Sequence, residues 1–120
     1  MPNPIPEFFV STGIVGAGAP TYAVYVRRPS GSLRRIASIE LPVCDTRLEA
    51  LDYLEFWLHC KAVSGPRCDR AEYRRQLARV QGEQVAAGGK ADPGCTGWPY
   101  GSPEWTWAKA ALEGVASGQG

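Results

Sequence analysis

The chain has 120 residues, 44% of them hydrophobic, which predicts a single domain over residues 1–120 with one hydrophobic core. A formal net charge of +1 excludes binding to nucleic acid or an anionic membrane through overall charge alone. No apolar run approaches the roughly 20 residues that a membrane span needs, and the N-terminal segment lacks the basic start of a secretory signal, so we expect no membrane association and a cytoplasmic location.

The first third of the chain predicts about three antiparallel strands within residues 7–41. After an apolar first segment, residues 21–27 alternate between two faces, which is typical of a strand. Residues 28–32 combine Pro, Ser and Gly and predict a hairpin turn. The third strand is expected to run to the end of this region, with one face made of Leu33, Ala37, Ile39 and Leu41.

Three glycines stand between the first two predicted strands, at Gly13, Gly16 and Gly18. Their order is G-x-x-G-x-G, and a strand pattern follows them. A dinucleotide site needs G-x-G-x-x-G followed by a helix, and a P-loop needs a terminal GK[ST]. The glycines therefore predict a wide turn or bulge and no phosphate site.

A long helix is predicted over residues 46–63, opened by Thr46 and Glu49 in the spacing of a capping box. Its apolar residues cover more than one stripe, because a second side carries Tyr53, Phe56 and Cys60. Two interpretations remain open. The helix is either sandwiched between two layers, or its aromatic side contacts a partner.

Two further helices are expected over residues 69–81 and 103–116, separated by a flexible loop over residues 82–101. Asp69 is the expected N-cap of the first, and Ser102 followed by Pro103 begins the second. The fold class that follows is α+β: an antiparallel sheet of about three strands, a long helix packed on it, and two further helices.

The cysteines and the single histidine do not predict a metal site or a cofactor. Cys44, Cys60, Cys68 and Cys95 form no CxxC pair, which zinc sites usually contain, so we expect free thiols. A bond between Cys68 and Cys95 would fit only an oxidising compartment. His59 has no nucleophile motif around it, and we expect no enzymatic activity.

The N-terminal half, in "VSTGIVGAGAPTYAVYVRR" and "CDTRLEALDYLEFWL", resembles ribonuclease H. The resemblance places Glu49 at the family's helix glutamate and Asp69 at a later carboxylate. Thr12 stands where the family has its first aspartate before Gly13. Because two-metal hydrolysis needs several converging carboxylates, the resemblance implies a degenerate relative that does not cleave nucleic acid.

The strongest binding signal is the arginine-rich helix after residue 69. Arginines and aromatic residues are enriched at interface hot spots, which predicts a small inhibitor or interaction protein that docks on another protein. An accessory protein of a phage or mobile element, of the anti-CRISPR kind, is one example. The alternative is a nucleic-acid-binding module that contacts phosphate through the arginines. The predicted contact residues are Arg70, Arg74, Arg75, Arg79, Trp98, Tyr100 and Trp107.

Overall fold

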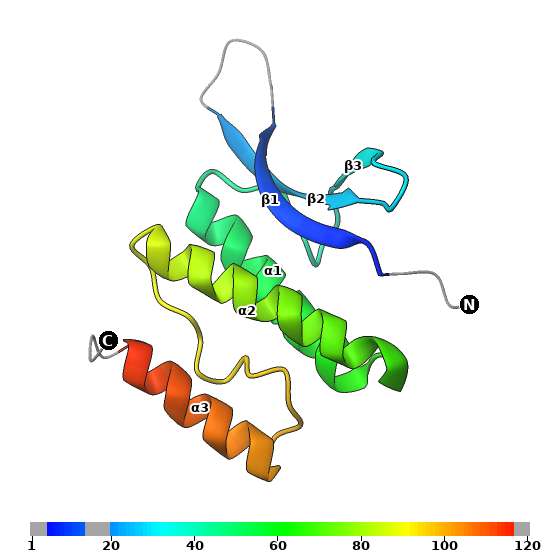
Figure 1. Cartoon of the computed structure of the whole chain (residues 1–120). Helices are drawn as coiled ribbons and strands as arrows, with labels where there is room; N and C mark the ends of the chain where they lie inside the picture. Colours follow the sequence, from blue (N-terminus) through cyan, green and yellow to red (C-terminus); the bar gives the residue numbers. More distant parts are fainter. Residues whose placement is uncertain (1–4, 14–19, 117–120) are drawn as a thin grey trace.

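The computed structural model describes residues 5–13 and 20–116, which form three strands and three α-helices (Figure 1). In chain order these are β1 (Glu7–Gly13), β2 (Thr21–Arg27), β3 (Leu33–Ile36), α1 (Arg47–Ser64), α2 (Arg70–Ala86) and α3 (Pro103–Ala116), with a single 3-10 turn η1 (Arg67–Asp69) before α2. The sheet is antiparallel with strand order β1-β2-β3. The predicted α+β class is therefore confirmed. The turn expected at Gly16 and Gly18 lies outside the described residues.

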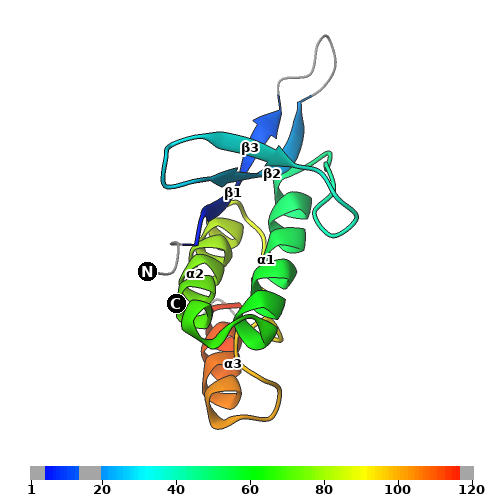
Figure 2. The same ribbon diagram turned by 90° about the vertical axis from the view of Figure 1, so that its right-hand side faces the viewer.

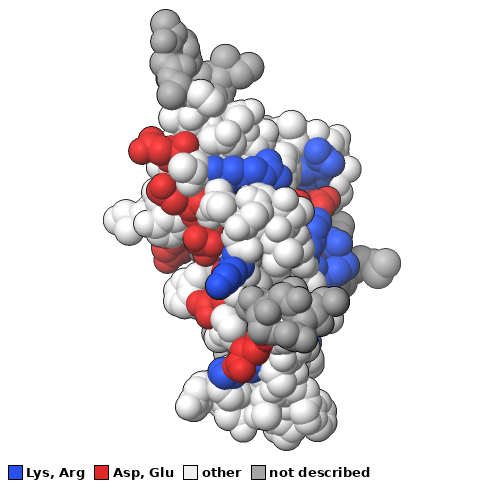
Figure 3. All heavy atoms as spheres, turned by 90° about the vertical axis from the view of Figure 1, so that its left-hand side faces the viewer, with Lys and Arg blue, Asp and Glu red and all other residues white. Residues whose placement is uncertain are grey.

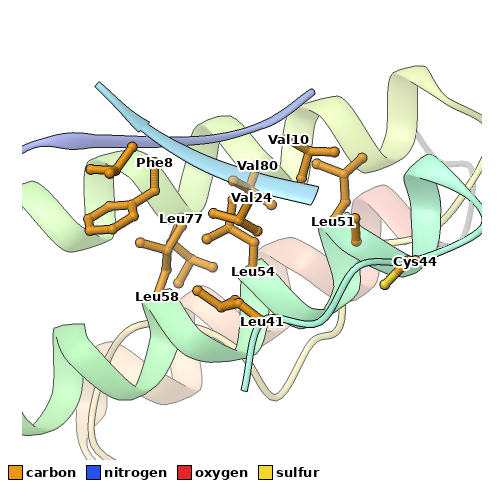
Figure 4. Close-up of a cluster of buried hydrophobic side chains, with 12 residues drawn as sticks. Phe8, Val10, Val24, Leu41, Cys44, Leu51, Leu54, Leu58, Leu77 and Val80 are labelled. Carbon is orange, nitrogen blue, oxygen red and sulfur yellow. The ribbon is translucent and has the colours of Figure 1, made fainter. Parts of the chain in front are cut away.

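Helices α1 and α2 pack side by side on one face of the sheet, and α3 lies on the side of this pair away from the sheet (Figures 1 and 2). Alternate residues of β1 and β2 point toward the helices because side chains of a strand alternate between its faces. They meet the leucines of α1 in one buried cluster (Figure 4). Its members include Phe8, Val10, Val24, Val26, Leu41, Leu51, Leu54, Leu58, Leu77 and Val80.

Strand β3 ends at Ile36, so the prediction that it runs to Leu41 is wrong. Ser38 makes a turn instead: its N–H donates to the carbonyl of Leu41 at 3.2 Å, and its Oγ accepts from the N–H of Leu41 at 3.1 Å. This local side-chain bond competes with strand pairing. The expected apolar face is consequently divided, since Leu41 is buried in the core whereas Ile39 is 98% exposed.

The ends of α1 and α3 lie within one residue of the predicted ends, and their N-caps form as expected. The Oγ1 of Thr46 accepts from the N–H of Glu49 at 3.2 Å, and the Oγ of Ser102 accepts from the N–H of Trp105 at 3.2 Å. Asp69 occupies the N-cap position of α2 but makes no capping bond with its side chain.

Helix α2 continues to Ala86, so the predicted end near residue 81 is wrong. The helix passes Gly82 because its last turns are held against α1: Gln84 is fully buried and donates to Asp52 at 2.8 Å and to Glu55 at 2.9 Å. These tertiary bonds outweigh the cost of about 1 kcal/mol for a glycine within a helix.

The 87–102 loop has neither helix nor strand, yet it is bonded to both long helices. The N–H of Asp92 donates to Glu55 at 2.8 Å, the N–H of Gly97 donates to His59 at 2.9 Å, and Gln81 donates to the carbonyl of Cys95 at 2.7 Å. The loop therefore follows a defined path; its predicted flexibility stays a prediction.

Side chains of α2 cover the outer edge of β1. The Oε1 of Gln76 accepts from the N–H of Phe8 at 2.9 Å, and its Nε2 donates to the carbonyl of Pro6 at 3.0 Å. Arg79 donates to the carbonyl of Phe8. The edge groups of Phe8 are thus satisfied without another strand, which protects this end of the β1 edge from pairing with other chains. Among the helices of the described chain, none is long and apolar enough to span a bilayer.

Candidate interaction surfaces

Two of the arginines predicted to bind a partner are neutralised within the fold. Arg75 forms a two-pronged contact with Glu72 at 2.8 and 2.6 Å. Arg79 lies 3.1 Å from Glu83 and 3.5 Å from Glu7. On the face of the molecule in Figure 3, basic side chains accordingly lie among acidic ones. Helix α2 therefore does not present its four arginines as one cationic stripe.

Arg70, Arg74 and Trp98 do come together, in what we call the arginine cleft. This hollow of about 310 Å³ lies between the start of α2 and the start of α3, and is lined by Ala62, Arg67, Arg70, Arg74, Trp98, Pro99, Ser102 and Glu104. The guanidinium of Arg74 stacks 3.7 Å from the centroid of the Trp98 ring, and the Nε of Arg70 donates to the carbonyl of Gly65 at 2.8 Å. Both side chains are thus partly used to hold the loop and the helix end.

The other two predicted aromatic contacts lie on the surface near α3. Tyr100 is 87% exposed, with its ring centroid 4.6 Å from that of Trp105, and Trp107 is 70% exposed. The seven predicted contact residues therefore belong to three separate regions: the arginine cleft, the ion-paired part of α2, and the outer surface around α3.

A second hollow, which we call the α1 groove, was not predicted as a site. It measures about 350 Å³ and lies between the Ser38–Leu41 turn and the outer side of α1; its lining residues are Ile39, Glu40, Tyr53, Phe56, Trp57, Cys60, Lys61 and Ser64. Tyr53, Phe56 and Cys60 share one face because residues three and four apart are neighbours on a helix. Phe56 is 62% exposed and Tyr53 is 46% exposed.

The exposure of these rings bears on the first of the two interpretations of α1, whereas contact of its aromatic side with a partner stays a prediction. The helix is not sandwiched on its aromatic side, because Phe56 and Ile39 keep most of their surface exposed within the described chain. The second apolar side of α1 was visible in the sequence. Ile39 was missed because it was assigned to the buried face of a strand that ends before it.

Two charged side chains line the α1 groove, and only one of them has a partner among the described residues. The ammonium of Lys61 lies 5.3 Å from the centroid of the Trp57 ring, a cation–π contact. Glu40 forms no ion pair with any residue that the structure describes. The pKa of the Cys60 thiol is raised by burial and, to a smaller extent, by the negative charge of Glu40. The rim of the groove thus carries one unpaired carboxylate.

A buried carboxylate, Glu55, joins α1, α2 and the 87–102 loop. It is 3% exposed and accepts hydrogen bonds from Gln81, Gln84 and the N–H of Asp92. Burial raises its pKa, and these three bonds oppose that rise by favouring the carboxylate. These hydrogen bonds give Glu55 a structural role, because they hold together α1, α2 and the loop, which are distant in sequence.

The described residues do not form a metal centre, since no three His, Cys, Asp or Glu side chains among them converge. Glu49 and Asp69, the carboxylates that the ribonuclease H resemblance picks out, flank opposite ends of α1. A helix of 18 residues is about 27 Å long, so these two carboxylates do not share an ion. Thr12 is exposed on β1.

Comparisons of the chain with known protein families, with curated proteins and with solved structures find no match. The ribonuclease H resemblance therefore stays a prediction.

Proposed function

We propose that this chain is a small, non-enzymatic interaction protein that docks on another protein through the α1 groove. The observation that carries the proposal is the exposure of Phe56, Tyr53 and Ile39 around one hollow. Folded monomers seldom leave large apolar side chains grouped in this way unless the surface is used. Aromatic side chains that line a pocket are the usual anchors of protein interfaces.

Burying these side chains supplies free energy for association. Covering a side chain of the size of Phe or Ile contributes about 1.5–3 kcal/mol. Ile39 and Phe56 are 98% and 62% exposed, so both have most of that contribution still to gain. Part of it is offset by the loss of translational and rotational freedom on binding.

The partner that fits is a protein segment with a bulky apolar side chain next to a lysine or arginine. The apolar side chain would enter between Phe56 and Ile39, and the basic group would meet Glu40, which has no ion pair within the described chain. Charge complementarity of this kind fixes orientation and increases the association rate more than it increases affinity.

The biological setting belongs to the same proposal. Ten arginines against three lysines, with abundant Ala, Gly and Pro, favour a GC-rich bacterial or phage origin. A cytoplasmic inhibitor of a host protein, as phages and mobile elements encode, needs a docking surface and no catalytic group. The arginine cleft, Tyr100 and Trp107 are further candidate contacts of such a protein.

The test is a capture experiment with the tagged full chain in nuclease-treated lysate of a GC-rich bacterium. Phe56→Ser and Glu40→Lys alter the groove. The control is Val85→Ser, because Val85 is 43% exposed on α2 outside the groove. We expect one protein to be retained by the wild type and by the control, and lost with both groove variants. Retention that is equal for all four proteins would refute docking through this groove.

A further inference from the structure

The face of the sheet opposite the helices carries an aromatic pair and two arginines. The three described α-helices lie on one side of the sheet, so no helix of the described chain covers its other face (Figures 1 and 2). Cross-strand partners project to the same face. Phe9 pairs with Tyr25, and Tyr25 pairs with Arg35, which places these three side chains in one row across the open face.

The two rings of this row lie close to parallel. The ring centroids of Phe9 and Tyr25 are 6.0 Å apart with an interplanar angle of 26°, and the guanidinium of Arg27 lies 5.1 Å from the Phe9 centroid. Both aromatic side chains are half-buried, so their positions are supported by the sheet while part of each ring remains accessible. An aromatic surface fixed in this way is suited to stacking with a planar group.

Two cations flank the pair on this face, and we call them the hairpin arginines: Arg27, whose guanidinium lies over the Phe9 ring, and Arg35, the cross-strand partner of Tyr25. Arg34 pairs instead with Val26, whose side chain faces the helices. Both hairpin arginines are exposed, and neither forms an ion pair with a carboxylate among the described residues. This distinguishes them from Arg75 and Arg79 of α2, whose charges are paired. Glu7, the acidic residue in the adjacent cross-strand row, is paired with Arg79.

We propose that the open face of the sheet binds single-stranded nucleic acid. Bases stack on Phe9 and Tyr25, and the hairpin arginines contact the phosphates. Single-stranded sites combine these same two elements: aromatic platforms for bases and a cationic surface along the backbone. A single strand is favoured over a duplex because the faces of its bases are available for stacking.

The combination favours nucleic acid over an acidic protein. Arginines alone would suit either ligand, but the ring pair next to Arg27 and Arg35 matches planar bases, which an acidic polypeptide lacks. The surface is separate from the α1 groove, and the inference does not rest on protein docking. It also differs from the sequence prediction, which assigned phosphate contacts to the arginines of α2.

The test measures fluorescence anisotropy of the full chain with labelled mixed-sequence oligonucleotides of about 12 nucleotides, a length within the range of small single-strand sites. Single-stranded RNA, single-stranded DNA and duplex DNA are compared. We expect a single strand to bind more tightly than the duplex. With two phosphate contacts, log affinity should fall with log salt with a slope of about −1.4.

Three variants identify the surface. Tyr25→Leu should weaken binding by about 5- to 150-fold through lost stacking, and Arg35→Gln should reduce the salt slope by about 0.7. The control is Arg47→Gln, which removes an equal charge from an exposed residue at the start of α1. Circular dichroism and thermal melting establish that each variant is folded. Because Arg35 is exposed, its variant keeps the test valid if Tyr25→Leu is unstable.

Several results would overturn the proposal. They are the absence of binding at low salt, equal affinity for duplex and single strand, and equal weakening by Arg47→Gln and Arg35→Gln. A folded Tyr25→Leu variant with unchanged affinity would also overturn it. Competition by polyglutamate as effective as that by unlabelled oligonucleotide would show that the surface recognises charge alone, which contradicts base stacking.

Discussion

The imidazole of His59 accepts a hydrogen bond at Nδ1 from the backbone N–H of Gly97, 2.9 Å away and 38 residues later in the chain. This bond requires Nδ1 to be unprotonated, so the neutral ring carries its proton on Nε2. Burial lowers the pKa of His59, while the nearby charge of Asp92 raises it by a smaller amount. The neutral imidazole is therefore part of the attachment of the 87–102 loop to α1.

A pH-dependent stability follows from the lowered pKa of His59. Below its ordinary value of 6.5, the unfolded chain binds a proton that the folded chain does not bind until a lower pH. The contribution of His59 is thus complete above about pH 6.5 and is lost as the pH falls toward the folded pKa. A difference of one pH unit between the two pKa values corresponds to about 1.4 kcal/mol. Urea unfolding between pH 5 and pH 8 measures the effect.

The control for this prediction is His59→Asn, which keeps an acceptor on a short side chain and removes the only histidine. Glu55 provides an internal contrast, because its pKa is raised by burial and its contribution is lost as the pH rises through that value. A loss of stability on acidification that persists unchanged in His59→Asn would show that another group is responsible.

The coverage of the β1 edge by Gln76 predicts a substantial cost for its removal. Gln76→Leu leaves the N–H of Phe8 buried without its acceptor at 2.9 Å. An unsatisfied buried donor costs about 1–3 kcal/mol, and we expect the free energy of unfolding in urea to fall by about that amount.

Arg75→Ala is the comparison for Gln76→Leu. It removes a two-pronged ion pair from the same helix, but the side chains of Arg75 and Glu72 are 57% and 34% exposed. Such exposed pairs contribute about 0–1 kcal/mol. If Arg75→Ala lowers the free energy of unfolding more than Gln76→Leu does, the buried hydrogen bond between Gln76 and Phe8 contributes less to stability than we predict.

The four cysteines should react with iodoacetamide in the order of their exposure. Cys68 is exposed, whereas Cys44 and Cys95 are buried. Burial raises the pKa of both buried thiols, and the charges of Glu55 and Asp92 raise that of Cys95 further. Because the thiolate is the reactive form, we expect peptide mass spectrometry to find Cys68 modified first, and Cys44 and Cys95 modified only on unfolding.

Cys60 provides a direct report on the α1 groove, since its thiol lines that hollow. Its rate of modification should lie between those of Cys68 and Cys95. A bound partner should slow the modification of Cys60 and leave that of Cys68 unchanged. Protection of both thiols to the same degree would indicate binding elsewhere.

Features that depend on neighbouring residues were predictable from the sequence. Thr46 and Ser102 cap the helices that follow them, as their spacing indicates. The alternating apolar residues of β1 and β2 form the inner face of the sheet. In each case the residues that predict the feature lie within a few positions of the residues that form it. Local propensity and periodicity are therefore sufficient to predict helix caps and strand faces.

Features that depend on distant residues were not predictable in this way. Arginine is a residue type common at interfaces, so the sequence predicted that Arg79 contacts a partner. In the structure Arg79 instead bonds to the carbonyl of Phe8 and pairs with Glu7, which are about 70 residues earlier in the chain. Similarly, Gly82 would end α2 only if the residues after it made no tertiary contacts. Gln84 makes two, because it donates hydrogen bonds to Asp52 and Glu55. The α1 groove required the position of Ile39, which depends on where β3 ends.

Alanine substitutions at Gly97 and Gly101 distinguish the cost of backbone strain from the cost of a steric clash. Both glycines have a positive φ, 78° and 83° respectively, which a side chain disfavours. A Cβ at Gly97 would lie 2.7 Å from Cγ of Arg74 and 3.2 Å from Cδ2 of Leu77, whereas a Cβ at Gly101 would meet nothing within 4 Å. Alanine should therefore cost about 1–2 kcal/mol at Gly101 through backbone conformation alone.

At Gly97 the same substitution should cost more, because the contact also displaces Arg74 from the Trp98 ring, which it faces at 3.7 Å. Arg74 and Trp98 are both half-buried, so their cation–π contact contributes about 0.5–2 kcal/mol. Urea unfolding compares the two alanine variants, and a change in tryptophan fluorescence should accompany Gly97→Ala. Equal destabilisation at the two sites would mean that Arg74 moves aside without cost, so that its stacking on Trp98 does not hold the loop.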